Sequence, residues 1–219
     1  MKLTDNLFYY PEHQMLDSNT YVIKDNTTVL FDPGLEQALP ALVEDMKRDG
    51  INPEDIDIVA NTHLHGDHCW ADEALKNMSG ARILLHQLQR QHFDTTVTKV
   101  SNFFGMPSFE LKEDGYLDEK LNTGNLEFEL LQKPGHSLDS ICFYCRKEGI
   151  LICGDVIFNG SVGRTDLPGG SGNQLKQSIE GLSQQHVEYL LPGHMDIVKG
   201  ADRVKRNFEL IKTQLFPWI

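Results

Sequence analysis

The stretch Thr62-His63-Leu64-His65-Gly66-Asp67-His68 is the most informative part of this chain for both its fold and its chemistry. It places three imidazoles and one carboxylate within the six residues from His63 to His68. Imidazole nitrogens and a carboxylate oxygen suit divalent zinc, iron or manganese, and no thiolate takes part. The alternative is a solvated polar loop that happens to be rich in histidine. Crowded imidazoles repel one another once protonated, however, and such a loop has no structural need for them. The pattern therefore predicts a metal site.

Three later junctions between an expected strand and a loop each carry one more ligand-type residue. These residues are His136 after 126–132, Asp155 after 149–153 and His194 after 187–191. A Gly or Pro beside each one lets the backbone turn sharply, so the side chain can project over the edge of a sheet. A single histidine of this kind is more often a surface or core residue. The repeated placement at strand ends argues against coincidence.

Hydrophobic periodicity predicts strands in two groups, each interleaved with helices. The expected strands are 7–10, 20–24, 28–31, 56–60, 81–85, 126–132, 140–145, 149–153 and 187–191, and the expected helices are 37–48, 71–78, 86–92, 174–182 and 201–215. This order favours two sheets packed face to face with helices outside. No internal repeat or linker is evident, so residues 1–219 are expected to form one domain.

The composition limits the classes of function. The chain has 219 residues, 40% of them hydrophobic, and a formal charge of −12, which argues against nucleic acid as a partner. No run approaches the ~18 apolar residues of a membrane helix, and Met1–Asp5 carries no signal-peptide pattern, so we expect a cytoplasmic protein without a membrane partner. The thiols of Cys142 and Cys145, three positions apart on an expected strand, should point to opposite faces of the sheet and stay reduced.

The order of the ligand-type residues resembles the metallo-β-lactamase superfamily, and the match spans Asp32 to His194. The resemblance implies an α+β fold, a four-layer αββα sandwich with the site along one edge of its two sheets. It also implies two divalent metal ions, with zinc preferred over iron or manganese. One metal would be held by His63, His65 and His136, the other by Asp67, His68 and His194, with Asp155 bridging them and Asp32 orienting the loop from outside. A metal-bound hydroxide, oriented by Asp67, would then be the nucleophile.

A finer resemblance concerns residues 156–170, which contain Gly163-Arg164-Thr165-Asp166. This stretch is similar to the glyoxalase II-like branch, which includes hydroxyacylglutathione hydrolases and persulfide dioxygenases. It implies a small-molecule substrate, a thioester of a thiol carrier or a related acyl compound. A mononuclear iron persulfide dioxygenase using His63, His65, His136 and Asp155 is the alternative, and a lactonase is a third option. Arg164 either pairs with Asp166 or another acid to stiffen the loop beside Asp155, which we favour, or contacts substrate.

The chain also departs from the branch. Only 25 residues follow His194, where the branch has a long helical region that holds glutathione, and Met195 stands where the branch usually has Gly. The aromatic-rich residues 93–114 are a candidate lid insertion, with ordinary core packing as the alternative. The helix expected at 201–215 is locally basic, which favours a solvated face over docking of an anionic thiol carrier or a second copy in a homodimer. No substrate-binding residue is assigned.

Overall fold

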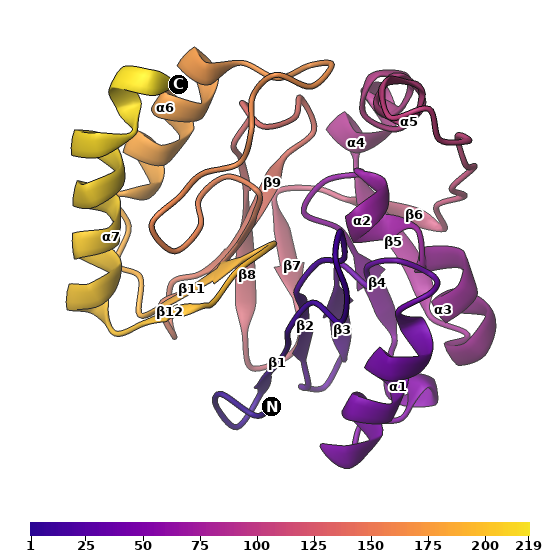
Figure 1. Cartoon of the computed structure of the whole chain (residues 1–219). Helices are drawn as coiled ribbons and strands as arrows, with labels where there is room; N and C mark the ends of the chain where they lie inside the picture. Colours follow the sequence, from indigo (N-terminus) through magenta and orange to yellow (C-terminus); the bar gives the residue numbers. More distant parts are fainter.

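The computed structural model describes residues 1–219 and consists of two six-stranded sheets (Figure 1). In the first sheet, β1, β2 and β3 pair antiparallel, and β3 to β6 pair parallel. The strands of this sheet are β1 Leu7–Tyr10, β2 Thr20–Ile23, β3 Val29–Phe31, β4 Ile58–Ala60, β5 Arg82–His86 and β6 Gly115–Leu117.

The second sheet has the order β12-β11-β10-β9-β8-β7 and is antiparallel except where β10 pairs with β11. Its strands are β7 Lys120–Asn122, β8 Glu127–Gln132, β9 Ile141–Cys145, β10 Ile150–Gly154, β11 Tyr189–Pro192 and β12 Val198–Lys199. The short strands β6, β7 and β12 were not among the expected ones, because two or three residues are too few to show a period in the sequence.

Helices cover the outer face of each sheet. The helical segments on the side of the first sheet are α1 Leu39–Arg48, η1 Pro53–Asp55, α2 Gly66–Cys69, α3 Asp72–Ser79, α4 Gln87–Gln91, η2 Asp94–Lys99 and α5 Val100–Phe103. Those on the side of the second are α6 Gly172–Leu182, α7 Ala201–Gln214 and η3 Phe216–Trp218. Figure 1 shows α6 and α7 together against one sheet and α1 and α3 against the other. The predicted four-layer αββα sandwich is confirmed.

Three separate apolar cores follow from these four layers. The middle core lies between the sheets, where the ring of Phe31 packs 4.8 Å from Phe143 and 6.0 Å from Phe128, measured between centroids. The two outer cores lie under the helices. The expected opposite orientation of Cys142 and Cys145 is confirmed, because Cys142 lies in the outer core beneath α6 and α7 while Cys145 lies in the middle core. Both thiols are free.

None of the helices combines the length and the apolar character that crossing a membrane requires. The residues that follow β3, β4, β8, β10 and β11 lie together at one edge of the sandwich. The ligand-type residues singled out in the sequence all follow these strand ends.

Candidate metal centre

Three histidines gather their ring nitrogens at one point of this edge. Nε2 of His63 and Nε2 of His136 lie 3.0 Å and 2.9 Å from Nδ1 of His65, and all three side chains are buried. His63 and His65 follow β4, whereas His136 follows β8 in the other sheet. Burial, reinforced by the neighbouring imidazoles, lowers the pKa of His63 well below its usual value and that of His65 to about 3. Their neutral rings offer lone pairs to a cation.

A second group forms beside the first from Asp67, His68 and His194. Nε2 of His194 lies 3.3 Å from Oδ2 of Asp67, and Nε2 of His68 lies 3.9 Å from the same oxygen. His68 is fully buried, whereas the side chains of Asp67 and His194 are 30% and 21% exposed. The second group is therefore the more open half of the cluster.

Asp155, directly after β10, lies between the two groups. Its Oδ1 is 3.3 Å from Nε2 of His68, and its Oδ2 is 3.5 Å from Nε2 of both His136 and His194. A side chain at Gly193 would collide with Oδ1 of Asp155, so glycine is required for this close approach. The carboxylate thus contacts both groups, as a bridge between two cations would.

The donor set fits metal binding. Three triads have ligand atoms within 4.8 Å of one another and could each hold a metal ion: His63/His65/His136, His63/His68/Asp155 and Asp67/His68/His194. Nε2 of His68 and Oδ1 of Asp155 are buried without a hydrogen-bond partner. An unpaired buried polar atom is costly, and coordination to a metal would satisfy both atoms.

In the more open half, nearby carboxylates raise the pKa of the histidines, whereas burial lowers it in the first group. Burial alone would lower the pKa of His68, but the negative charges of Asp155, Asp32 and Asp67 outweigh this effect and raise the pKa to about 10. In the same way, Asp155 and Asp67 overcome burial and raise the pKa of His194 to about 12. Protons therefore occupy these two rings when no cation is present, and a divalent cation would displace them.

Side chains and carbonyls outside the cluster fix the orientation of each ring. Asp32, just after β3, accepts hydrogen bonds from the backbone N–H and the hydroxyl of Thr62, both at 2.7 Å, and from Nδ1 of His68 at 3.0 Å. Nδ1 of His194 faces Oε2 of Glu12 at 3.3 Å. When Nδ1 of a histidine donates its proton to such a partner, Nε2 of the same ring keeps its lone pair for a metal.

Arg164 acts on the cluster through its backbone. Its carbonyl accepts a hydrogen bond from Nδ1 of His136 at 2.8 Å, while its guanidinium binds Asp166 through two contacts of 2.7 Å. A side chain at Gly163 would overlap the backbone oxygen of Asp155, which explains the glycine before Arg164. The favoured ion pair with Asp166 is present, and the loop after β10 orients His136 as well.

The structure brings together all seven residues proposed as metal ligands, with Asp32 and Arg164 next to them. Sequence reasoning missed Glu12, Asn19 and Asp139. Glu12 and Asn19 lie in the long loop between β1 and β2, remote in sequence from the His194 segment that they contact. No local pattern marks such contacts. Asp139, three residues after His136, offered a weak signal as an acidic residue just before an apolar strand.

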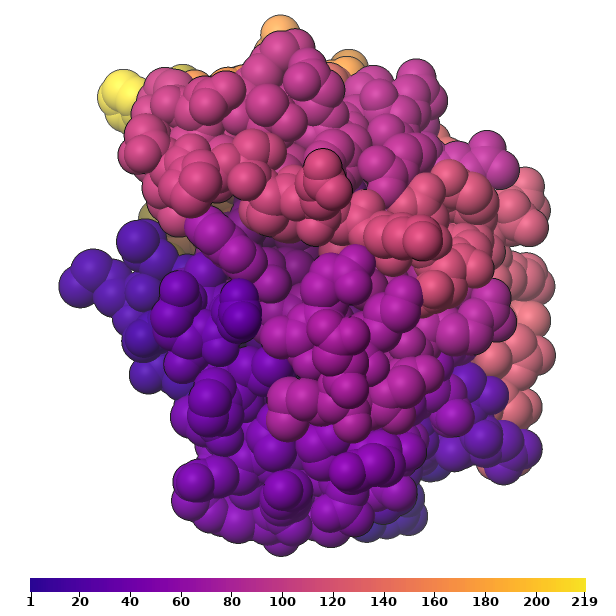
Figure 2. Space-filling model, turned by 90° about the vertical axis from the view of Figure 1, so that its right-hand side faces the viewer, coloured from indigo at the N-terminus to yellow at the C-terminus, as the bar shows by residue number.

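The candidate lid, residues 93–114, forms η2 and α5 followed by an extended segment. Phe109 stacks on Trp70 with ring centroids 5.3 Å apart, and together with Phe93 it packs against the outer core. Phe103 and Phe104 are about half exposed, and the guanidinium carbon of Arg164 lies 5.9 Å from the centroid of Phe104. The aromatic residues therefore divide between core packing and the rim of the metal cluster. Figure 2 shows this magenta-to-pink part of the chain at the top of the molecule, above the indigo and purple N-terminal third.

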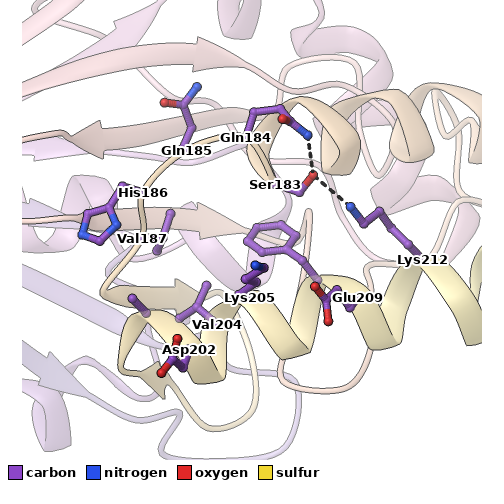
Figure 3. Close-up of a pocket in the computed structure, with 12 residues that line it drawn as sticks. Ser183, Gln184, Gln185, His186, Val187, Asp202, Val204, Lys205, Glu209 and Lys212 are labelled. Atoms are coloured by element: carbon purple, nitrogen blue, oxygen red, sulfur yellow. Dashed lines mark hydrogen bonds between the residues drawn. The ribbon is translucent and has the colours of Figure 1, made fainter.

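A separate groove of about 470 Å³ lies between α7 and the segment that follows α6 (Figure 3). Its side chains carry mixed charges, from Lys205 and Lys212 to Asp202 and Glu209, and Lys212 donates to the hydroxyl of Ser183 at 3.2 Å. None of its lining residues belongs to the metal cluster. The ligand-type residues converge elsewhere, so this groove is not the candidate centre.

Comparison with known proteins identifies the family. A family model described as the metallo-beta-lactamase superfamily matches residues 14–194. The chain belongs to this superfamily. Among its relatives, a probable metallo-hydrolase (MJ0888) of Methanocaldococcus jannaschii is 34% identical over 188 residues, which cover 82% of this chain and 88% of the relative. The hydroxyacylglutathione hydrolase GloC of Haemophilus influenzae is 27% identical over 178 residues, covering 80% of this chain and 78% of GloC.

Two solved structures have a similar fold. The B3 metallo-beta-lactamase BLEG-1 superposes with a TM-score of 0.78 at 29% identity, covering 93% of this chain and 99% of BLEG-1. TTHA1623 in a di-iron-bound form superposes with a TM-score of 0.73 at 26% identity, covering 96% of this chain and 100% of TTHA1623.

Proposed function

We propose that this protein is a metal-dependent hydrolase with a dinuclear centre that cleaves a thioester or a related acyl substrate. The observation that carries the proposal is the position of Asp155, which contacts His68 at 3.3 Å and His136 at 3.5 Å and so joins two groups of ligands. His63, His65 and His136 would hold one cation, and Asp67, His68 and His194 the other, with Asp155 shared. Zinc is the preferred metal, and iron or manganese would fit the same nitrogen and oxygen donors.

When bound, such a metal pair supplies a hydroxide nucleophile near neutral pH and a positive charge for the oxyanion that develops on the substrate. Asp67 is the carboxylate best placed to orient the nucleophile, because its side chain is 30% exposed at the open half of the cluster. Asp155 and Asp32 are buried and already engaged with His68. The substrate carbonyl would therefore approach from the side of Asp67 and His194.

The thiol next to the cluster is not an alternative nucleophile. Cys69 directly follows His68, but its thiol is buried and donates to the carbonyl of His65 at 3.3 Å. Burial, with the nearby carboxylates, raises its pKa well above the usual value, so the reactive thiolate does not form. This favours direct attack by water over a covalent acyl-enzyme.

A thioester suits a site without a further acid. A thiolate leaves unprotonated near neutral pH because thiols are far more acidic than alcohols, so no general acid has to protonate the leaving group. Two exposed apolar side chains lie next to the site and would accommodate an acyl group: Met195, which directly follows His194, and Phe104, whose ring centroid lies 5.9 Å from the guanidinium carbon of Arg164. The relation to GloC supports the same substrate class.

A persulfide dioxygenase with one iron is the second candidate, and the buried group of His63, His65 and His136 with Asp155 favours it. The di-iron form of TTHA1623 supports iron as a metal for this type of site. Lactone and β-lactam hydrolysis are further alternatives, the latter because of the likeness to BLEG-1.

The deciding experiment assays one preparation, loaded in turn with zinc and with iron, on four substrates: an acyl-glutathione, a glutathione persulfide with oxygen consumption recorded, an acyl-homoserine lactone and a β-lactam. The proposal predicts thioester hydrolysis as the activity with the highest kcat/KM. Oxygen consumption that depends on iron and on the persulfide, without thioester hydrolysis, would contradict it.

A further inference from the structure

The two halves of the cluster each rest on one buried polar side chain that is not itself a ligand. We propose that Asn19 is a positioning residue for the half that contains His194, and that Asp139 is the positioning residue for the half formed by His63, His65 and His136. This inference rests on the proposed dinuclear centre, and it assigns separate support to each half.

Asn19 holds the segment that carries His194 at three points. Its Nδ2 donates to the carbonyls of Pro192 at 3.0 Å and Met195 at 2.8 Å, and its backbone N–H donates to the carbonyl of Gly193 at 2.7 Å. His194 lies between these carbonyls in the chain. Asn19 is fully buried, so water cannot replace these bonds. The position of His194 therefore depends on the amide of Asn19.

The acceptor side of the same amide holds the loop that orients His194. Oδ1 of Asn19 accepts from the backbone N–H of Glu12 at 3.1 Å and from the hydroxyl of Tyr9 at 3.3 Å. Glu12 in turn faces Nδ1 of His194 at 3.3 Å. One amide thus fixes both the segment of His194 and the carboxylate that orients its ring, with all of its hydrogen-bonding groups used.

Met195 shows that this segment is held against its local preference. Its φ angle of +65° lies in the left-handed region, which a side chain other than glycine rarely adopts. The hydrogen bond from Asn19 to the carbonyl of Met195 holds this conformation in place. Backbone strain next to a ligand persists when surrounding contacts determine it, as they do here.

Asp139 links the loop of His136 to the segment between His63 and His65. Its Oδ2 accepts from the backbone N–H of Leu64 at 3.0 Å, and its Oδ1 accepts from the hydroxyl of Thr96 at 3.1 Å. The carboxyl group is fully buried. Asp139 therefore connects the loop of His136 to the segment of His63 and His65 and, through Thr96, to η2.

The two supports are independent of each other. Asn19 makes no hydrogen bond to the segments 61–65 or 136–140, and Asp139 makes none to 192–195. A change at one residue should therefore weaken one metal and spare the other. A general loss of stability would weaken both.

The test measures the affinity for each of two cobalt(II) ions by competition with a chelator, with the absorption spectrum of each variant. Asn19→Asp removes two donors and sets a carboxylate against two carbonyl oxygens. It should weaken one metal by about tenfold to a hundredfold and give the spectrum of His194→Ala. Asp139→Ala should weaken the other metal to a similar extent and give the spectrum of His136→Ala.

Combined variants sharpen the assignment. Asn19→Asp should add no further loss to His194→Ala, whereas Asp139→Ala combined with His194→Ala should weaken the binding of both ions. Asp139→Asn is the conservative variant, because its oxygen can accept from Leu64 and its amide can donate to Thr96, so it should restore binding. Asn6→Asp is the matched control, since Nδ2 of Asn6 donates at 2.7 Å only to the carbonyl of Lys24 in the turn between β2 and β3.

The outcomes separate this inference from the proposed function. Wild-type protein that binds fewer than two cobalt ions contradicts the dinuclear centre itself. Wild-type protein that binds two ions, with equal weakening of both or unchanged binding in Asn19→Asp and Asp139→Ala, overturns only the positioning roles. If Asp139→Ala fails to fold, as circular dichroism would show, the comparison of Asn19→Asp with His194→Ala still decides the role of Asn19. Asp139→Glu, whose carboxylate is displaced by one methylene, then decides the role of Asp139: it should weaken the metal of His136, and cobalt affinity equal to wild type would overturn the role.

Discussion

Nδ1 of His68 donates a hydrogen bond of 3.0 Å to Oδ2 of Asp32, and both side chains are buried. The same carboxylate binds the backbone and hydroxyl of Thr62, at the start of the segment with three histidines. Asp32 itself has a φ angle of +53°, which is costly for aspartate and shows that its position is determined by these contacts. Orientation of His68 is thus built into the end of β3.

Removal of this carboxylate by Asp32→Ala should lower metal affinity by about tenfold to a hundredfold, since His68 loses the group that fixes its ring. Competition with a chelator would measure the change. Asp57→Ala is the control, because Asp57 accepts from the backbone N–H of Thr28 at 2.7 Å away from the cluster. Equal affinity in Asp32→Ala and wild type would exclude this role.

Asp155→Ala should remove the carboxylate that lies between the two groups of ligands. We expect loss of at least one metal ion per chain and a fall in kcat/KM of at least about a hundredfold, with the fold retained because β10 and β11 keep their pairing. Elemental analysis measures the loss of metal, and circular dichroism shows whether the fold is retained. A variant that keeps two metals and full activity would disprove the bridge.

Asp72 gives a prediction for the dependence of stability on pH. Its side chain is fully buried, and burial raises its pKa well above the usual value. Asn61 donates to Oδ2 of Asp72 at 2.6 Å, while Oδ1 of each residue lacks a partner. A proton on Asp72 would remove the buried negative charge. Because the folded pKa is raised, this residue's contribution is fully present below about pH 4 and declines as the pH rises toward the folded pKa.

Asp72→Asn should therefore remove this part of the pH dependence, because an amide pairs with Asn61 at every pH. The free energy of unfolding, measured with urea at pH 5 and pH 8 in the presence of a chelator, should favour the variant more at pH 8 than at pH 5. A difference between variant and wild type that does not change with pH would show that Asp72 is not protonated.

Met195→Gly tests the strain beside His194. A left-handed conformation costs an ordinary residue roughly 1–2 kcal/mol, and the greater freedom of glycine in the unfolded chain offsets about 0.5–1 kcal/mol of the gain. We expect the variant to be more stable than wild type by up to about 1.5 kcal/mol in urea unfolding. A loss of stability of similar size would mean that the side chain of Met195 makes a packing contribution larger than the strain.

The sequence alone was sufficient to predict the layers and the ligand cluster. His63 to His68 are close in the chain, and a Gly or Pro marks each of the later strand ends, so local signals indicate where His136, Asp155 and His194 project. The buried side chains that position the cluster, Asn19 and Asp139, give no such signal. Asn19 is 176 residues from Met195 in sequence, and their contact depends on the pairing of whole sheets. Likewise, the division of residues 93–114 between core and rim follows from how Phe109 meets Trp70, which no period in the sequence expresses.

The central claim is the dinuclear centre, and elemental analysis of freshly purified protein, with the metal content expressed per chain, tests it most directly. Seven ligand-type side chains joined through Asp155 predict two divalent metal ions per chain, and zinc as the main metal. A preparation that is active with one metal ion per chain, or with none, would contradict the account.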